Sequence, residues 1–125
     1  MVVCYTPVMP PALQADGRFW LTLNGRNFLG RGRVELLQRI RETGSISKAA
    51  KAMKMSYKAA WDAVDAMNSA WGSTLVESGP AGSRLTTDAE QLIAAWQRAE
   101  IRHMEFMKKL AISLHSTPCA RIDQQ

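Results

Sequence analysis

The sequence predicts a mainly α-helical fold with a small β component. Three helical patterns follow one another closely over residues 33–71, a hairpin pattern comes directly after them, and an unbroken helical pattern closes the chain. With 125 residues, 46% of them hydrophobic and 22% charged, the chain has the size and composition of one globular domain. It has no run of about 18 apolar residues, so no transmembrane helix is expected, and its start lacks the features of a secretory signal.

The start of the chain predicts a leader followed by a strand. Residues 1–17 contain three prolines and no periodicity, so we expect a flexible leader there. Residues 18–24 alternate in character, which predicts a strand with Phe19, Leu21 and Leu23 on its buried face. Glycines then break the pattern. We expect this strand to be able to extend the later hairpin into a small sheet.

Two helices come next. The apolar period predicts a first helix over 33–42, which Gly44 ends as a left-handed cap. A short second helix is expected over 48–54, with either Ser45 or Ser47 as its N-cap.

A third helix is predicted over 57–71, beginning after Ser56 and ending at Gly72. Its period places four apolar side chains on the inward face: Ala60, Val64, Met67 and Trp71. Because very few residues separate the second helix from the third, the spacing is that of a helix-turn-helix. Two short runs, 74–77 and 83–86, then flank a Gly-Pro-Ala-Gly tip and predict a β-hairpin. The hairpin makes residues 18–86 a winged helix-turn-helix.

A long helix is predicted over 87–115, with a disordered tail over 116–125. Thr87 and Glu90 have the T-x-x-E spacing of a capping box. At about 1.5 Å per residue this helix is roughly 40 Å long, which is more than a small domain needs. Apolar side chains recur at alternating steps of four and three, which favours a dimerisation helix over one that packs only on its own domain. This dimerisation seam consists of Leu92, Trp96, Ala99, His103, Phe106 and Leu110.

Positive charge is concentrated in the first half of the chain. Residues 1–58 contain ten Lys and Arg against three Asp and Glu, a balance of +7, whereas residues 59–125 contain six against eight, a balance of −2. A basic half indicates an anionic partner such as nucleic acid or a membrane surface, although a basic domain with no such partner has the same composition.

The sequence gives no support for an enzyme or a metal site. It lacks phosphate-binding glycine motifs and H-E-x-x-H. His103 and His115 are twelve residues apart, and Cys4 and Cys119 lie near opposite ends, so neither pair forms a metal or disulfide framework. We expect no catalytic residue, no metal and no cofactor, and the cytoplasm is the default location.

Two motifs within residues 44–77 carry a family resemblance. GSIS-x-AA and SYK-x-AWDA-x-x-x-MN, the latter over residues 56–68, resemble the amino-terminal DNA-binding domain of the molybdate-responsive ModE regulators. The pattern GS-x-x-x-AA with a later Leu85-Thr86 is similar to LysR-type winged helices. The resemblance implies a dimeric DNA-binding regulator. Full-length relatives have a carboxy-terminal part that binds molybdate; this sequence stops after the long helix, so we expect that part, and any response to molybdate, to be absent.

In a helix-turn-helix the third helix enters the major groove by its N-terminal residues. Lys58 can reach a guanine or a phosphate, and Tyr57 a phosphate or a thymine methyl group. Trp61 either lies partly in the groove or packs beneath the second helix. Asp62 either accepts from a cytosine amino group or orients a neighbouring lysine.

Further basic residues surround the third helix. Three lysines at steps of three on the second helix suit phosphates, although a solvated lysine face has the same pattern. Arg84 on the wing could contact a minor groove or a phosphate. The candidate DNA-binding residues are Ser47, Lys48, Lys51, Lys54, Ser56, Tyr57, Lys58, Trp61, Asp62 and Arg84.

Two functions remain open at this point. The first is a sequence-specific transcription regulator that binds double-stranded DNA as a homodimer, with no membrane partner and with any effector or partner protein unidentified. The second is an architectural or protein-interaction module on the same fold, without operator specificity. Steep salt dependence combined with preference for one DNA sequence distinguishes the first from the second.

Overall fold

The structure is a computed structural model that describes residues 13–123, with side chains described up to residue 114. The described chain forms two compact units: Phe19–Gln97, and a unit that combines residues 13–18 with residues 98–123. Most of the predicted leader lies outside the described residues, and residues 13–20 have no regular secondary structure.

The first β element is a hairpin of β1 (Leu21–Leu23) and β2 (Arg26–Leu29). The sequence analysis predicted the first strand and missed the second. Asn24 and Gly25 both have positive φ, 52° and 78°, so they form a two-residue turn that reverses the chain. Leu21 is partly exposed, and the predicted buried face is therefore incomplete.

The three predicted helices are confirmed as α1 (Arg31–Thr43), α2 (Ile46–Ala52) and α3 (Tyr57–Trp71). Gly44 ends α1 in the left-handed conformation, as predicted. Of the two candidate caps for α2, Ser45 is the cap, because its side chain accepts a hydrogen bond from the backbone N–H of Lys48. Ser56 caps α3 by accepting from the backbone N–H of Ala59 at 3.0 Å.

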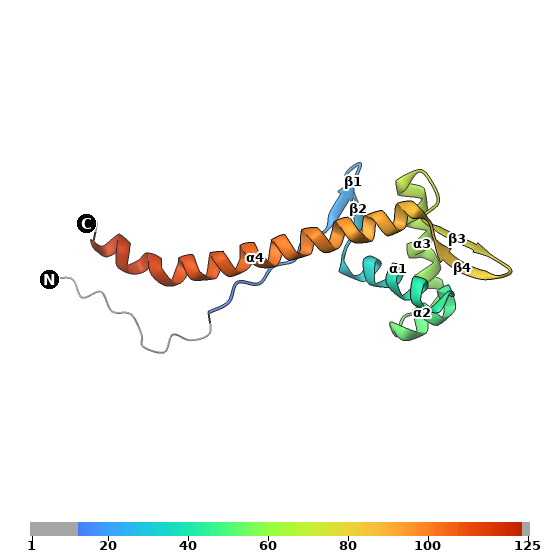
Figure 1. Ribbon diagram of the computed structural model, residues 1–125, viewed down its shortest axis with the longest axis horizontal. Coiled ribbons are helices and arrows are strands. Elements are labelled where there is room, and N and C mark those ends of the chain that lie inside the picture. Colours follow the sequence, from blue (N-terminus) through green and yellow to red (C-terminus); the bar gives the residue numbers. More distant parts are fainter. Residues whose placement is uncertain (1–12, 124–125) are drawn as a thin grey trace. The chain divides into compact units, whose positions relative to one another are not determined.

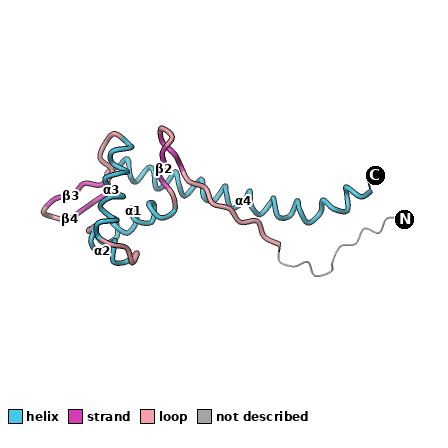
Figure 2. Tube along the Cα trace, turned by 180° about the vertical axis from the view of Figure 1, so that it is seen from behind, coloured by secondary structure: helices cyan, strands magenta, loops and turns pink. Residues whose placement is uncertain are grey.

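The wing is the hairpin of β3 (Val76–Gly79) and β4 (Gly82–Leu85). It forms its own two-stranded sheet, so the expectation that the first strand could extend the wing is wrong. Figures 1 and 2 show the two hairpins as separate elements beside the helices. Among the described strands, β1 pairs with β2 and β3 pairs with β4, and no pairing joins the two hairpins.

The long helix α4 spans Thr87–Asp123. Its N-cap is Thr86 and not Thr87, because the Thr86 hydroxyl accepts from the backbone N–H of Ala89. Residues 116–123 belong to this helix, where the sequence analysis expected a disordered tail. Pro118 lies within the bounds of this helix.

The core lies where α1, α2 and α3 meet the bases of both hairpins and the start of α4. α1 packs against α2, α2 packs against α3, and β4 lies against α1. All the members of the core are apolar, and the largest fully buried ones are Leu29, Leu36, Leu37, Ile40, Val64, Met67, Leu75 and Ile93. This packing fixes α3 against the domain on one side only.

Candidate nucleic-acid interface

The two faces of α3 have opposite character. Of the four predicted inward residues, Ala60, Val64 and Met67 are buried. Trp71 is not: it is 37% exposed, and its indole N–H donates to Oδ2 of Asp88 at the start of α4. Tyr57 and Lys58, in the first turn, are exposed. The N-terminal turn of α3 therefore presents polar side chains to solvent while the apolar stripe anchors the helix.

Lys58 is paired with a carboxylate on its own helix. Its Nζ lies 2.9 Å from Oδ2 of Asp62, one turn further along α3. Both side chains are largely exposed, so the pair adds little to folding stability. Of the two roles considered for Asp62, the one seen in this structure is to hold the neighbouring lysine.

Trp61 is half-buried and packs against the core. Tyr57 meets it edge to face, with ring centroids 6.1 Å apart. The indole Nε1 of Trp61 is buried and has no hydrogen-bond partner among the described residues. The structure thus places Trp61 as a packing residue beneath the exposed surface of α3.

The three lysines before α3 are all exposed and have no ion pair within the described chain. Lys48 and Lys51 lie on α2, together with the exposed Ser47. The sequence predicts Lys54 at the end of the second helix, but α2 ends at Ala52 and Lys54 lies after it. It has φ of 56° and occupies the turn to α3, where Met55 N–H donates to the Ala50 carbonyl and closes α2 in a Schellman motif.

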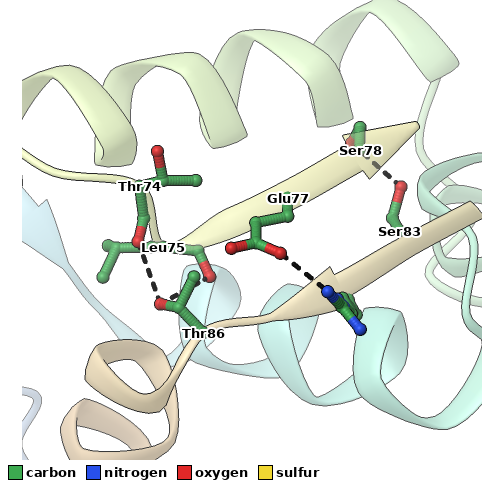
Figure 3. Close-up of polar contacts among 7 residues, drawn as sticks. Thr74, Leu75, Glu77, Ser78, Ser83 and Thr86 are labelled. Carbon is green, nitrogen blue, oxygen red and sulfur yellow. Dashed lines mark hydrogen bonds and ion pairs between the residues drawn. The ribbon is translucent and has the colours of Figure 1, made fainter.

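The wing is held both internally and to the helix-turn-helix. Arg84 Nε donates to Glu77 Oε2 at 3.2 Å, and the hydroxyls of Ser78 and Ser83 lie 3.0 Å apart (Figure 3). The backbone N–H of Ser83 donates to the carbonyl of Gly44, which ends α1. Gly82 is needed here, since a Cβ at this position would lie 2.6 Å from that same carbonyl oxygen.

Two polar residues, Asn68 and Thr86, stabilise the base of the wing, a role that the sequence does not predict. Asn68 Oδ1 accepts from the backbone N–H groups of Leu75 and Val76, at 2.8 and 3.3 Å. The Thr86 hydroxyl donates to the carbonyls of Thr74 and Leu75 (Figure 3). Both residues occur in the quoted motifs, MN and L-T, so these parts of the motifs stabilise the base of the wing.

The predicted dimerisation seam is divided in the structure. Trp96 is 3% exposed and stacks on Phe19, with ring centroids 4.4 Å apart, so it is a core residue and cannot belong to an intermolecular surface. Leu92 also packs against that core. Ala99 and His103 are partly buried, and Phe106 and Leu110 are exposed. The sequence does not reveal this division, because apolar residues recur at the same alternating steps of four and three in the turns that face the core and in the turns that are exposed.

The described residues contain neither a metal cluster nor a membrane span. No group of three or more His, Cys, Asp and Glu side chains in this part of the chain could hold a metal ion. No described helix combines the length and apolar content that a bilayer crossing requires.

Comparison with known proteins identifies the domain. Residues 32–90 match the family described as bacterial regulatory helix-turn-helix protein, lysR family. The molybdenum-pterin-binding protein MopB of Rhodobacter capsulatus is 40% identical over 95 residues, which are 72% of this chain and 35% of MopB. The transcriptional regulator ModE of Yersinia pestis is 42% identical over 86 residues, 65% of this chain and 33% of that protein. This chain therefore spans about a third of the length of these relatives.

Solved structures agree on the fold. The crystal structure of the CbnR DBD–DNA complex has a TM-score of 0.55 at 19% identity and covers 66% of this chain and 95% of that one. A LysR family transcriptional regulator has a TM-score of 0.51 at 17% identity, covering 69% of this chain and 29% of that one. The chain therefore has a winged helix-turn-helix fold like that of LysR-type regulators, and its sequence is similar to the amino-terminal third of ModE regulators, as its motifs predicted.

Proposed function

We propose that this chain is the DNA-binding part of a transcription regulator that recognises specific duplex sequences as a homodimer, with α3 in the major groove. The observation that carries the proposal is the exposed N-terminal turn of α3 beside three exposed lysines that form no ion pair with any described residue. A major groove about 12 Å wide admits one α-helix, and the first turn of that helix reaches the base edges. Such a regulator would act in the cytoplasm.

The surrounding cations support a division of labour. Lys48 and Lys51 are exposed on α2, which in this motif crosses the DNA backbone, and Lys54 follows in the turn. Unpaired ammonium groups bind phosphates irrespective of sequence and release counterions. Lys58 starts the helix that would enter the groove, where an ammonium can donate to guanine O6 and N7.

The homodimer is supported by the far part of α4. Phe106 and Leu110 are large apolar side chains that remain exposed in the single chain. Exposed apolar surface on a helix is typical of an interface. A two-fold dimer would place two copies of α3 on half-sites about one DNA turn apart, or a multiple of it, so the bound site would be nearly palindromic.

The test compares Lys58→Ala with Lys51→Ala, using salt titrations on a selected site and on random duplex DNA. Loss of Lys58 should cost roughly 1–3 kcal/mol on the selected site and relax one base position in each half-site. Loss of Lys51 should weaken all sequences alike and reduce the salt slope by about 0.9 for each phosphate that is no longer neutralised, in both protomers.

Lys108→Ala is the matched control, because Lys108 is an exposed lysine on α4 and outside the helix-turn-helix. It should leave both quantities unchanged. If neither Lys58→Ala nor Lys51→Ala alters binding, α3 is not the DNA-binding face, and a protein-interaction module becomes the better account.

A further inference from the structure

The cations of the candidate interface are of two kinds. Lys48, Lys51 and Lys54 have no ion pair within the described residues. Lys58, on α3, and Arg84, on the wing, are each held by a carboxylate, at 2.9 and 3.2 Å respectively. Lys58, at the start of the helix expected to enter the major groove, is therefore one of the two cations that already have a carboxylate partner.

The exposed face of α3 is in fact net negative. Lys58 is the only cation of this helix, which the structure describes throughout, while Asp62 and Asp65 follow four and seven residues later and are both exposed. The helix period places these three residues on one side of α3. A helix that only had to adhere to DNA would not present two carboxylates to the phosphate backbone, because like charges repel.

We propose that Asp62 is a specificity-determining positioning residue, which holds Lys58 away from the phosphates of unrelated DNA. This inference rests on the proposed function. On an unrelated sequence, Lys58 can reach a phosphate only by leaving Asp62, whose carboxylate then faces the anionic backbone unpaired. On the specific site, Lys58 instead donates to a base acceptor within the groove, and Asp62 stays beside it or accepts from a cytosine amino group.

The benefit to the protein is selectivity and not affinity. A solvent-exposed ion pair is weak and opens readily, so Asp62 does not prevent Lys58 from reaching a base. It lowers binding to the large excess of unrelated sequences, and discrimination depends on the ratio of specific to unspecific binding. The three lysines around α2 supply sequence-independent attraction, so this penalty on α3 can be tolerated.

The experiment compares Asp62→Asn with Asp65→Asn in the full chain. Both changes remove one exposed negative charge from the same face of α3, but no ion pair joins Asp65 to Lys58 in the described structure. Each variant is titrated with salt on random duplex DNA and on the site selected by the unaltered chain. Circular dichroism checks that the fold is retained.

Asp62→Asn should strengthen binding to random DNA several-fold, and its salt slope there should steepen by about 0.9 per protomer because Lys58 is then able to bind a phosphate. The ratio of specific to random binding should fall by the same several-fold factor. Asp65→Asn should strengthen binding to both DNAs alike and leave the ratio and the base preference unchanged. In a Lys58→Gln background, Asp62→Asn should no longer steepen the slope.

Equal effects of Asp62→Asn and Asp65→Asn would overturn the inference, because net charge alone would then account for both. An unchanged ratio for Asp62→Asn would overturn it as well. These outcomes leave the proposed function intact provided that the unaltered chain still selects one sequence. An unaltered chain that binds all sequences alike would instead overturn the proposed function and this inference with it.

Discussion

Residues 19–97 and residues 98–114 differ in where most of their large apolar side chains lie. In the first region most of them, from Phe28 to Trp96, form one buried cluster, and Trp20, Tyr57 and Trp71 are exceptions. In the second region Ile101, Phe106 and Ile112 are 58, 57 and 67% exposed. The first region therefore completes a core by itself. The second presents the kind of apolar surface that a partner normally covers, which is why we propose a dimer contact there.

The contrast is sharpest within one helix. Trp96 and Phe106 are aromatic residues on α4, both at positions of the predicted seam, yet Trp96 is 3% exposed and Phe106 is 57% exposed. A regular apolar repeat shows which face of a helix is apolar but not what that face meets. Changes at Trp96 and Phe106 test this distinction directly, and changes at Asn68 and Lys54 test the wing base and the turn before α3.

The largest effect is expected for Trp96→Ala. Removing this buried indole and its stacking on Phe19 should lower the free energy of unfolding by about 3–5 kcal/mol. Urea denaturation at a fixed protein concentration measures the change. Phe106→Ala serves as the control and should leave the core of the winged domain intact. A small loss for Trp96→Ala would mean that this residue does not belong to the core.

Phe106→Glu should act on association. A carboxylate placed in a desolvated seam should weaken the dimer by roughly 100-fold, or about 2.8 kcal/mol. Sedimentation equilibrium measures the dissociation constant, and Arg102→Glu offers a control on the same helix at an exposed charged position. A Phe106→Glu chain that sediments as an unchanged dimer would remove Phe106 from the interface.

Asn68→Ala should loosen the wing. The backbone N–H groups of Leu75 and Val76 would lose their acceptor in a part-buried position, costing about 1–3 kcal/mol of unfolding free energy. Ser69→Ala, an exposed neighbour on α3, should change stability little. Denaturant unfolding compares the two. Equal stability of both variants would show that the Asn68 side chain does not hold the wing base.

The smallest effect is expected at Lys54, whose left-handed backbone favours glycine. Lys54→Gly should raise stability by about 0.5–1 kcal/mol while weakening DNA binding at low salt. Lys54→Ala should weaken DNA binding equally without the gain in stability. Thermal unfolding and a binding titration on each variant separate the two effects. Stronger DNA binding by the glycine variant would exclude a phosphate contact for Lys54.

Most of the helical fold could be predicted because its signals are local. Gly44 and Gly72 end helices in the left-handed conformation, and Ser56 caps α3, as predicted from residue type alone. The missed strand β2 had an equally local signal, the Asn24-Gly25 turn, which the glycine-rich surroundings obscured. The cap at Thr86 was misplaced by one residue because two threonines are adjacent, and only the hydrogen bond of Thr86 distinguishes them.

The exposure of the candidate residues was predictable, but the detailed geometry around them was not. Exposure of Tyr57 and Lys58 followed from the period of the third helix. The turn conformation of Lys54 could not be predicted, because lysines that recur every three residues are equally typical of a helix that continues through Lys54. Asn68 accepts hydrogen bonds from residues seven and eight positions later in the chain. Because those residues lie beyond the end of α3, helical periodicity does not reveal this role.

The most direct test of the central claim is selection of bound fragments from random duplex DNA at physiological salt, using the intact chain. The account predicts enrichment of one near-palindromic site whose half-sites lie about one DNA turn apart or a multiple of it. Recovery of fragments with no common sequence, at an affinity that depends only on salt, would contradict it.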